Sequence, residues 1–137
     1  MKPEDRVELF HRGMAAFLSG DMDEALKFYS ADVESVASDW MNVGIFKGHE
    51  GFLRMNALWD EAWEEWTYDV QEVRAVGERH VIARIRVGGR GRGSGIEVNE
   101  EVGYVAEINN EGLGSYLEIT RDEARALEIA REREVSN

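Results

Sequence analysis

The chain has 137 residues, a length typical of one domain, and we expect residues 1–137 to form a single domain. Its formal net charge of −12 repels nucleic-acid phosphates and anionic lipid, so neither nucleic acid nor a membrane is expected as a partner. The chain contains no cysteine, which excludes disulfides, thiolate nucleophiles and cysteine-based zinc sites. No apolar run is long enough to span a membrane and the polar N-terminus does not resemble a signal peptide, so we expect a cytoplasmic protein.

Three helices are predicted in the first half of the chain. Apolar residues at helical spacing favour a helix from about Glu4 to Leu18, which Ser19-Gly20 ends. Asp21 is a suitable N-cap for a short second helix, about Met22 to Ser30. A third helix is expected from about His49 to Trp63, and its buried stripe consists of Phe52, Met55, Trp59, Ala62 and Trp66.

Strands are predicted on both sides of the third helix. The stretch Val33–Ser38 is expected to be a strand, and residues 39–44 form a loop with large apolar side chains, which is typical of loops that line a site. After Glu65 the apolar period changes from about 3.6 to about 2 residues, which predicts four further strands. Their expected positions are Trp66–Val76, His80–Val87, Ile96–Ile108 and Leu113–Ile119.

A glycine-rich segment and a final helix complete the pattern. Gly88–Gly95 also contains arginine, but no helix follows it as in a dinucleotide-binding loop, and it is too short for an RNA-binding tract. We therefore expect a strand connection or a bulge there. Thr120, with Glu123 after it, is expected to cap the final helix. The residues expected to dock this helix are Ala124, Leu127 and Ala130.

This order of elements predicts an α+β fold. A curved antiparallel sheet is expected to wrap around three N-terminal helices as a cone with one internal pocket, followed by a short C-terminal helix. Such cavities are typical ligand sites, so we expect a small apolar ligand or substrate. Trp40, Trp59 and Tyr104 are the expected walls, because Trp and Tyr are apolar yet present one polar atom. Met55 and Arg84 complete the predicted ligand-binding set.

Four polar residues are the candidates for catalysis, namely Asp39, His49, Arg86 and Glu118. Asp39 begins the apolar loop and either faces the pocket or caps the loop. His49 begins the third helix and acts either as a base near neutral pH or as a cap of that helix. The other two histidines, His11 and His80, are expected at the surface, so neither a metal site nor a cofactor is expected.

The two arginines of the central strand allow two interpretations. Arg84 and Arg86 lie on one face of that strand and could bind a carboxylate or carbonyl oxygen in the cavity. Alternatively, they form a ladder of salt bridges on a solvent or dimer face. The candidate partners for such a ladder are Glu100, Glu107 and Glu118.

Several separated landmarks resemble the SnoaL-like branch of the nuclear transport factor 2-like superfamily. They are the element order and three segments, namely Gly20-Asp21-Met22-Asp23, Gly44-Ile45-Phe46-Lys47-Gly48-His49-Glu50-Gly51 and Arg90-Gly91-Arg92-Gly93-Ser94-Gly95. The resemblance covers about Arg6 to Ala130. It implies a cystatin-like cone, and a homodimer through the outer sheet face. The superfamily contains ketosteroid isomerases, polyketide cyclases, dehydratases, epoxide hydrolases and members without known activity, and the fold does not decide among them.

The resemblance also implies positions for catalytic residues. Aligned through Gly20-Asp21, the tyrosine of steroid isomerases falls on Gly13, their base on Ala37 and their second acid close to Gly103. The isomerase trio is therefore missing from this chain.

Limonene-type epoxide hydrolases use two carboxylates and an arginine. Glu118 lies near one of these carboxylate positions, and Arg84 or Arg86 lies near the arginine, whereas the second carboxylate is absent. This resemblance supplies only half of a catalytic set.

Three classes of function stay open at the level of the sequence. One is a cofactor-independent acid/base enzyme of the isomerase, cyclase, dehydratase or epoxide hydrolase type. Another is a non-catalytic protein that binds a small molecule in the same pocket. The third is an association module that works as a dimer through its sheet face. The residues do not name a substrate, and they do not decide whether the protein is an enzyme.

Overall fold

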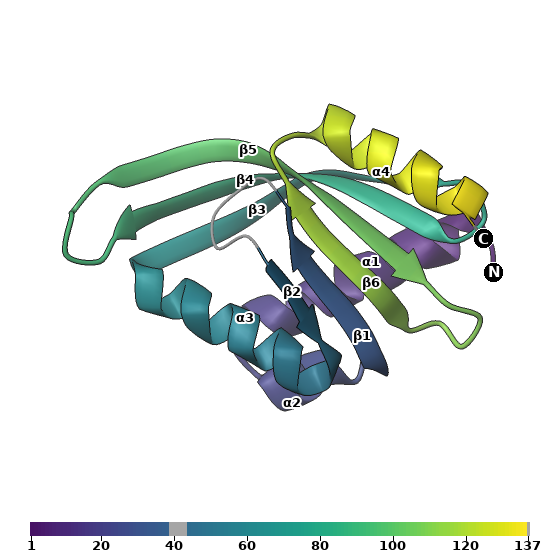
Figure 1. Ribbon diagram of the computed structural model, residues 1–137, viewed down its shortest axis with the longest axis horizontal. Coiled ribbons are helices and arrows are strands. Elements are labelled where there is room, and N and C mark those ends of the chain that lie inside the picture. The colour runs from purple at the N-terminus through teal and green to yellow at the C-terminus, as the bar shows by residue number, and fades with distance from the viewer. Residues whose placement is uncertain (39–43, 137) are drawn as a thin grey trace.

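The computed structural model describes residues 1–38 and 44–136, and it has the α+β architecture predicted from the sequence (Figure 1). Helices and strands alternate at first and are followed by a meander of strands. Their bounds are α1 (Pro3–Leu18), α2 (Met22–Leu26), β1 (Tyr29–Ala37), β2 (Gly44–Lys47), α3 (Gly48–Ala62), β3 (Trp63–Val76), β4 (His80–Gly91), β5 (Glu97–Ile108), β6 (Gly114–Thr120) and α4 (Glu123–Ser136). No helix among these residues is long and apolar enough to cross a membrane.

The six strands form one curved sheet in the order β2-β1-β6-β5-β4-β3. Its pairs are antiparallel except for β1 and β6, which run parallel from the pair Glu34–Tyr116 to the pair Ala37–Ile119. The sheet is therefore antiparallel as expected, except at this one pair. Parallel strands need a long connection between them. The elements from β2 to β5 provide such a connection between β1 and β6.

The sheet also gains an edge strand, β2, in a stretch that we expected to lead into the third helix. This strand has only four residues and pairs with the end of β1. The glycines at the start of α3, directly after β2, have a steric role. Gly48 begins α3 with φ of +72°, and a Cβ on Gly51 would lie 2.6 Å from the carbonyl carbon of Phe46. Glycine at both positions thus lets α3 fold back closely onto β2.

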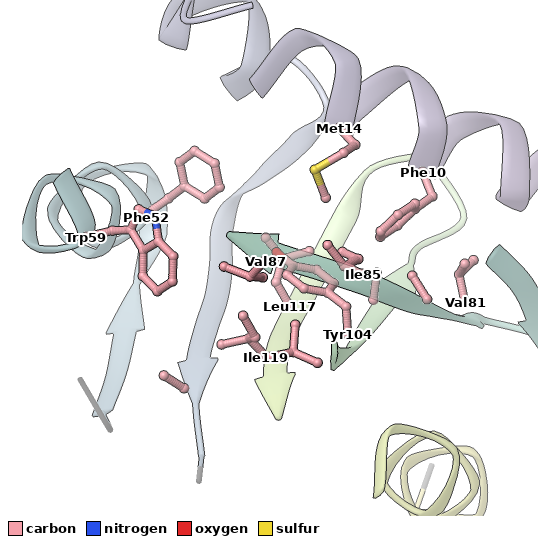
Figure 2. Close-up of a cluster of buried hydrophobic side chains, with 14 of the residues drawn as sticks. Phe10, Met14, Phe52, Trp59, Val81, Ile85, Val87, Tyr104, Leu117 and Ile119 are labelled. Carbon is pink, nitrogen blue, oxygen red and sulfur yellow. The ribbon is translucent and has the colours of Figure 1, made fainter. Parts of the chain in front are cut away.

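The concave face of the sheet carries the main core, and α1, α2 and α3 lie on this side (Figure 1). Alternation along β4 places Val81, Ala83, Ile85 and Val87 on this face, as predicted. Figure 2 shows Phe10 and Met14 pointing from α1 toward these strands, with Phe52 and Trp59 coming from α3. Burial of each such large side chain contributes roughly 1.5–3 kcal/mol.

The convex face carries a second, smaller cluster under α4. Ala126, Ile129 and Ala130 of this helix pack against Ile82 and Val105. Of the three residues expected to dock it, only Ala130 lies in the buried part of this cluster.

The predicted cap of α4 is also wrong. Asp122 accepts the backbone N–H of Arg125 at 2.8 Å, whereas Thr120 is the fully buried last residue of β6. The strand continues further than its apolar pattern indicates, so the helix begins later.

The glycine-rich segment is a strand connection, which is one of the two forms we expected. β4 continues through it to Gly91, and the turn that follows has positive φ at Gly93 (85°) and Gly95 (70°). The resulting hairpin of β4 and β5 extends beyond the rest of the sheet (Figure 1).

Candidate functional site

An apolar cavity lies between the concave face of the sheet, α1 and α3. Its volume is about 40 Å³, which accommodates about three water-sized groups at roughly 10–15 Å³ each. The eleven lining residues are Met14, Phe17, Tyr29, Ala37, Phe52, Met55, Asn56, Trp59, Tyr68, Tyr104 and Ile119. They come from two helices and four strands, so only the folded chain brings them together.

Aromatic rings form most of the cavity wall, and they pack against one another. The rings of Tyr29 and Phe52 lie 4.7 Å apart, and the ring of Trp59 meets that of Tyr68 edge-on at 5.7 Å. Phe17 lies 6.0 Å from Tyr68. These rings thus form a continuous apolar wall around the cavity.

Three tyrosines provide the hydroxyl groups of this cavity. Burial raises the pKa of Tyr29 to about 12, and burial also raises the pKa of Tyr68. Burial also raises the pKa of Tyr104 well above its usual value, with a further contribution from the nearby hydroxyls of Tyr29 and Tyr68. All three groups are therefore protonated at neutral pH and are able to donate a hydrogen bond. Their hydroxyls have no hydrogen-bond partner within the described ranges 1–38 and 44–136.

Asn56 adds an amide to these hydroxyls. It lies on α3, four residues after Phe52, and its Nδ2 donates to the Phe52 carbonyl oxygen at 2.8 Å. This bond to the helix backbone fixes the amide at the cavity wall and leaves its other polar atoms for a ligand.

The lining set has no charged side chain among the residues that the structure describes. Such a cavity favours a mainly apolar molecule and offers hydrogen bonds to an oxygen on it. The same donors would stabilise negative charge that develops on a carbonyl oxygen. A proton acceptor that works near neutral pH is not among these lining groups.

Three of the predicted ligand-binding residues line the cavity, namely Met55, Trp59 and Tyr104. Trp40 and the catalytic candidate Asp39 lie outside the described residues. The structure therefore brings together the part of the predicted set that came from the helical stripe and from β5.

His49 lies at the start of α3 but is not part of the cavity wall. Its Nε2 is 3.0 Å from the carbonyl oxygen of Tyr29, so the ring ties the beginning of α3 to the beginning of β1. This contact is structural, but it is not the cap of the third helix that the sequence left open for His49, since α3 has no side-chain cap.

Arg84 and Arg86 lie on the convex face, away from the cavity. Arg84 Nε is 3.3 Å from one carboxylate oxygen of Glu101, and Arg86 Nη2 is 2.9 Å from the other. This is a salt-bridge ladder at the surface, although its acid is Glu101 and not one of the three glutamates we expected.

Glu118 is buried on the same convex face, where the Tyr116 hydroxyl donates to it. Val105 is its partner on β5, so the carboxylate lies under the α4 side of the sheet. The three catalytic candidates that the structure describes, His49, Arg86 and Glu118, are thus not gathered at the cavity.

The positions implied by steroid isomerases lie on different sides of the sheet. Ala37 lines the cavity, and Gly13 is next to it, where an added Cβ would be 3.7 Å from the Tyr29 hydroxyl. Gly103 faces the other way, because a Cβ there would lie 2.0 Å from the backbone oxygen of Asp122. The residue of β5 that faces inward is its neighbour Tyr104.

His80 departs most from its expected place at the surface, because it is fully buried beneath the end of α4. Its Nδ1 forms a hydrogen bond with the Glu134 carboxylate, and its Nε2 is 3.5 Å from Glu107. Burial lowers the pKa of His80, which the two carboxylates oppose. Because α4 covers it, this group holds the helix on the sheet and does not contribute to the cavity.

A metal centre is also not apparent in residues 1–38 and 44–136, where no three histidine, aspartate or glutamate side chains are grouped as ligands.

Tyr29, Tyr68 and Asn56 were not chosen as site residues from the sequence. Asn56 was detectable, since it occupies a helical face with Phe52 and Trp59, and a polar residue on a buried stripe often contacts a ligand. Tyr68 lies on the inward register of its strand but could not be distinguished from core. Tyr29 was missed because its stretch was assigned to the second helix, whereas it begins β1.

Comparison with known proteins agrees with this architecture. An NTF2-like protein from Burkholderia xenovorans has a TM-score of 0.77 at 20% identity, over 95% of this chain and 98% of that chain. TerC, co-crystallised with polyporic acid, has a TM-score of 0.75 at 16% identity, over 97% and 99% of the two chains. A protein of ketosteroid isomerase-like fold from Catenulispora acidiphila, in complex with trimethylamine, has a TM-score of 0.71 at 16% identity, over 88% and 90%.

These identities are low, so the likeness to solved structures shows the fold alone. No curated protein matches the chain. The SnoaL-like domain matches residues 10–113, which are most of the sequence. This match includes the second half of α1, all of α3 and most of the sheet, and with them nearly every residue that lines the cavity. The chain therefore belongs to the SnoaL-like domain family.

Proposed function

We propose that this protein binds a small, mainly apolar molecule that carries a carbonyl or hydroxyl oxygen. The observation that carries the proposal is the cluster of three protonated tyrosine hydroxyls in an otherwise apolar cavity. A hydrogen bond from one of these hydroxyls to a ligand oxygen would contribute roughly 0.5–1.5 kcal/mol. The apolar remainder of the ligand would contact the aromatic walls.

The size of the cavity supports a compact ligand. About 40 Å³ holds about three water-sized groups, which is less than a five-membered ring needs, so such a ring is bound only if the wall moves. Met14 and Met55 are unbranched and adaptable, so they are the wall residues that would make room for a ligand. TerC with polyporic acid and the Catenulispora protein with trimethylamine support the idea that this fold accepts small molecules.

The second candidate function is an acid/base enzyme without a cofactor, favoured by the same tyrosines. Donors that converge on a ligand oxygen would stabilise an enolate after a proton is removed from the neighbouring carbon. In this proposal Asp39 is the base, because Ala37, two residues before it, lines the cavity. His49, Arg86 and Glu118 are not proposed to touch the ligand, since they are not part of the cavity wall.

An isosteric pair of ligands tests the binding proposal. Cyclopentanone and methylenecyclopentane have nearly the same shape, but only the ketone has an oxygen acceptor. Saturation-transfer NMR and thermal shift should show both in the cavity, with the ketone bound about twofold to tenfold more tightly. Equal binding of the two would contradict the role of the tyrosines, and no binding of either would contradict the site.

Hydrogen exchange at the ketone separates a binder from an enzyme. If Asp39 is a base, the protein in D₂O should exchange the hydrogens next to the cyclopentanone carbonyl faster than buffer does. The Asp39→Asn variant should lose that exchange and keep the affinity. Exchange at the rate of buffer in both proteins would favour the non-catalytic function.

A further inference from the structure

A surface groove lies directly outside the cavity. We call it the α1–α3 groove, because it runs between the C-terminal end of α1, the start of α2 and α3, which all lie on one side of the sheet (Figure 1). Its volume is about 440 Å³. Its walls are Phe17, Leu18, Gly20, Met22, Leu53, Asn56, Ala57, Asp60 and Trp66.

Two side chains belong to the groove and to the cavity at once, namely Phe17 and Asn56. Each is half-buried, as expected for a group with one side toward solvent and one toward the interior. The barrier between the surface and the cavity at this place is therefore one side chain thick.

Phe17 is the movable part of this barrier. It lies in the last turn of α1, which ends at Leu18 and is followed by Gly20 with φ of +85°. Its ring stacks on Trp66 at 5.7 Å and has looser contacts with Phe52 and Tyr68. These are ring contacts without hydrogen bonds, so a change of rotamer breaks no polar interaction. The end of a helix is also the part that opens most easily.

The opposite parts of the barrier are fixed. Trp66 Nε1 donates to Asp60 Oδ1 at 2.7 Å, which locks the strand side of the groove to the end of α3. Asn56 is held by its bond to the Phe52 carbonyl oxygen. Phe17 thus moves against a rigid frame.

The rim of the groove is unusually apolar for a chain with a net charge of −12. Leu18 is 43% exposed and Leu53 is 39% exposed, one on each side. Exposed apolar side chains that flank a groove mark a place where apolar molecules are received.

From this continuity we infer that the α1–α3 groove is the route by which the ligand reaches the cavity, and that Phe17 is the gate. This inference rests on the proposed function, because it assigns a path to the same small apolar molecule. Phe17 then limits which molecules enter, since only one ring has to turn aside and the frame around it is fixed.

Access through the gate is measurable without any ligand, because the chain has no cysteine of its own. Met14 lines the cavity and is 7% exposed, so Met14→Cys places a single thiol inside. Its rate of reaction with methyl methanethiosulfonate, followed by mass spectrometry, reports how often the cavity opens. Phe17→Ala in this background should raise the rate at least about tenfold, in proportion to the open fraction. Ala57→Trp, which fills the exposed groove, should lower the rate at least about threefold.

Matched controls separate the gate from general loosening. Phe46→Ala removes a half-buried ring that lines neither hollow, and Ala124→Trp adds a bulky group on α4, so neither should change the rate beyond its effect on unfolding. Equal acceleration by Phe17→Ala and Phe46→Ala, or no slowing by Ala57→Trp, would overturn the inference. Ile119→Cys gives a second reporter on another wall if Met14→Cys does not fold. These rates do not depend on ligand affinity, so a failure of ketone binding would reject the proposed function and leave the gate intact.

Discussion

Tyr104 combines the two properties on which the site depends, since it is buried and yet faces an enclosed space. Its side chain is 9% exposed, and its pKa is raised by burial and by two neighbouring tyrosines. A hydroxyl in such a place is kept neutral, and so it acts as a hydrogen-bond donor and not as a charge. The same residue type on the convex face, Tyr116, donates instead to a carboxylate. The face of the sheet on which a tyrosine lies therefore determines which partner its hydroxyl group has.

Removal of one hydroxyl should show this difference. We expect Tyr104→Phe to weaken cyclopentanone binding about twofold to tenfold, because one hydrogen bond to the ligand is lost, and to leave methylenecyclopentane binding unchanged. Titration by NMR measures both affinities. Tyr116→Phe is the matched control and should change neither. If Tyr104→Phe weakened both ligands equally, its effect would come from packing and not from the hydroxyl.

At the scale of elements, α4 is held to the sheet by a buried polar cluster in addition to its apolar face. Glu134 accepts the backbone N–H groups of Glu78 and Arg79, each at 3.0 Å, and bonds to His80. Arg133, the residue before it, donates to Glu107 at 2.8 Å. The end of α4 is thus bound both to the turn between β3 and β4 and to the convex face of the sheet.

Neutralisation of one carboxylate should test this attachment. Glu134→Gln is expected to lower the free energy of unfolding by roughly 1–3 kcal/mol, because the buried His80 ring and two backbone N–H groups lose a charged acceptor. Glu132→Gln on the same helix is the control, since the side chain of Glu132 is 67% exposed, and it should change stability by less than about 0.5 kcal/mol. Urea unfolding measures both, and equal losses would contradict the role of Glu134.

The same cluster predicts a loss of stability in acid. Burial alone would raise the pKa of Glu134. Hydrogen bonds from Glu78, His80 and Arg79 outweigh burial and hold this pKa at about 2, below its usual 4.5. Burial lowers the pKa of His80 from 6.5. Both groups bind protons more readily in the unfolded chain, so stability falls as pH drops below 6.5 and falls further between 4.5 and 2.

A pH series of unfolding midpoints checks this sign. The decline should be smaller in Glu134→Gln, which lacks the carboxylate, than in the unchanged protein. A stability that rises on acidification from pH 6.5 would contradict the assignment.

At the scale of the whole molecule, the two faces of one sheet are used differently. The concave face packs against α1 and α3 and leaves the cavity, whereas the convex face is only partly covered by α4. The uncovered part carries the ladder of Arg84 and Arg86 with Glu101. We propose that a second copy of the chain docks on this part, as the resemblance implied.

Light scattering should then give a mass of twice 15.6 kDa at micromolar protein. Reversal of both arginines, Arg84→Glu with Arg86→Glu, places like charges beside Glu101 in both copies and should weaken the dimer at least about tenfold. Arg54→Glu with Arg131→Glu, two exposed residues outside the ladder, is the control for net charge, because it makes the charge more negative by the same amount. A monomer in the unchanged protein would exclude this dimer.

Sequence periodicity determined the class of fold, because a change from helical to alternating spacing follows directly from which faces must be buried. It also placed Trp59 and Met55 correctly on the inner stripe of α3. Tertiary structure decided the rest of the site. A shift of one residue along a strand moves a side chain to the opposite face, which separates Tyr104 from Gly103.

Burial of the polar candidates was likewise decided only by packing. The alternation in β4 shows that His80, Arg84 and Arg86 share a face, but not that α4 covers one end of it and leaves the other open. That helix comes from the end of the chain, and its docking depends on contacts between residues about fifty positions apart. Most polar groups that line the cavity are tyrosines, which local patterns could not distinguish from core.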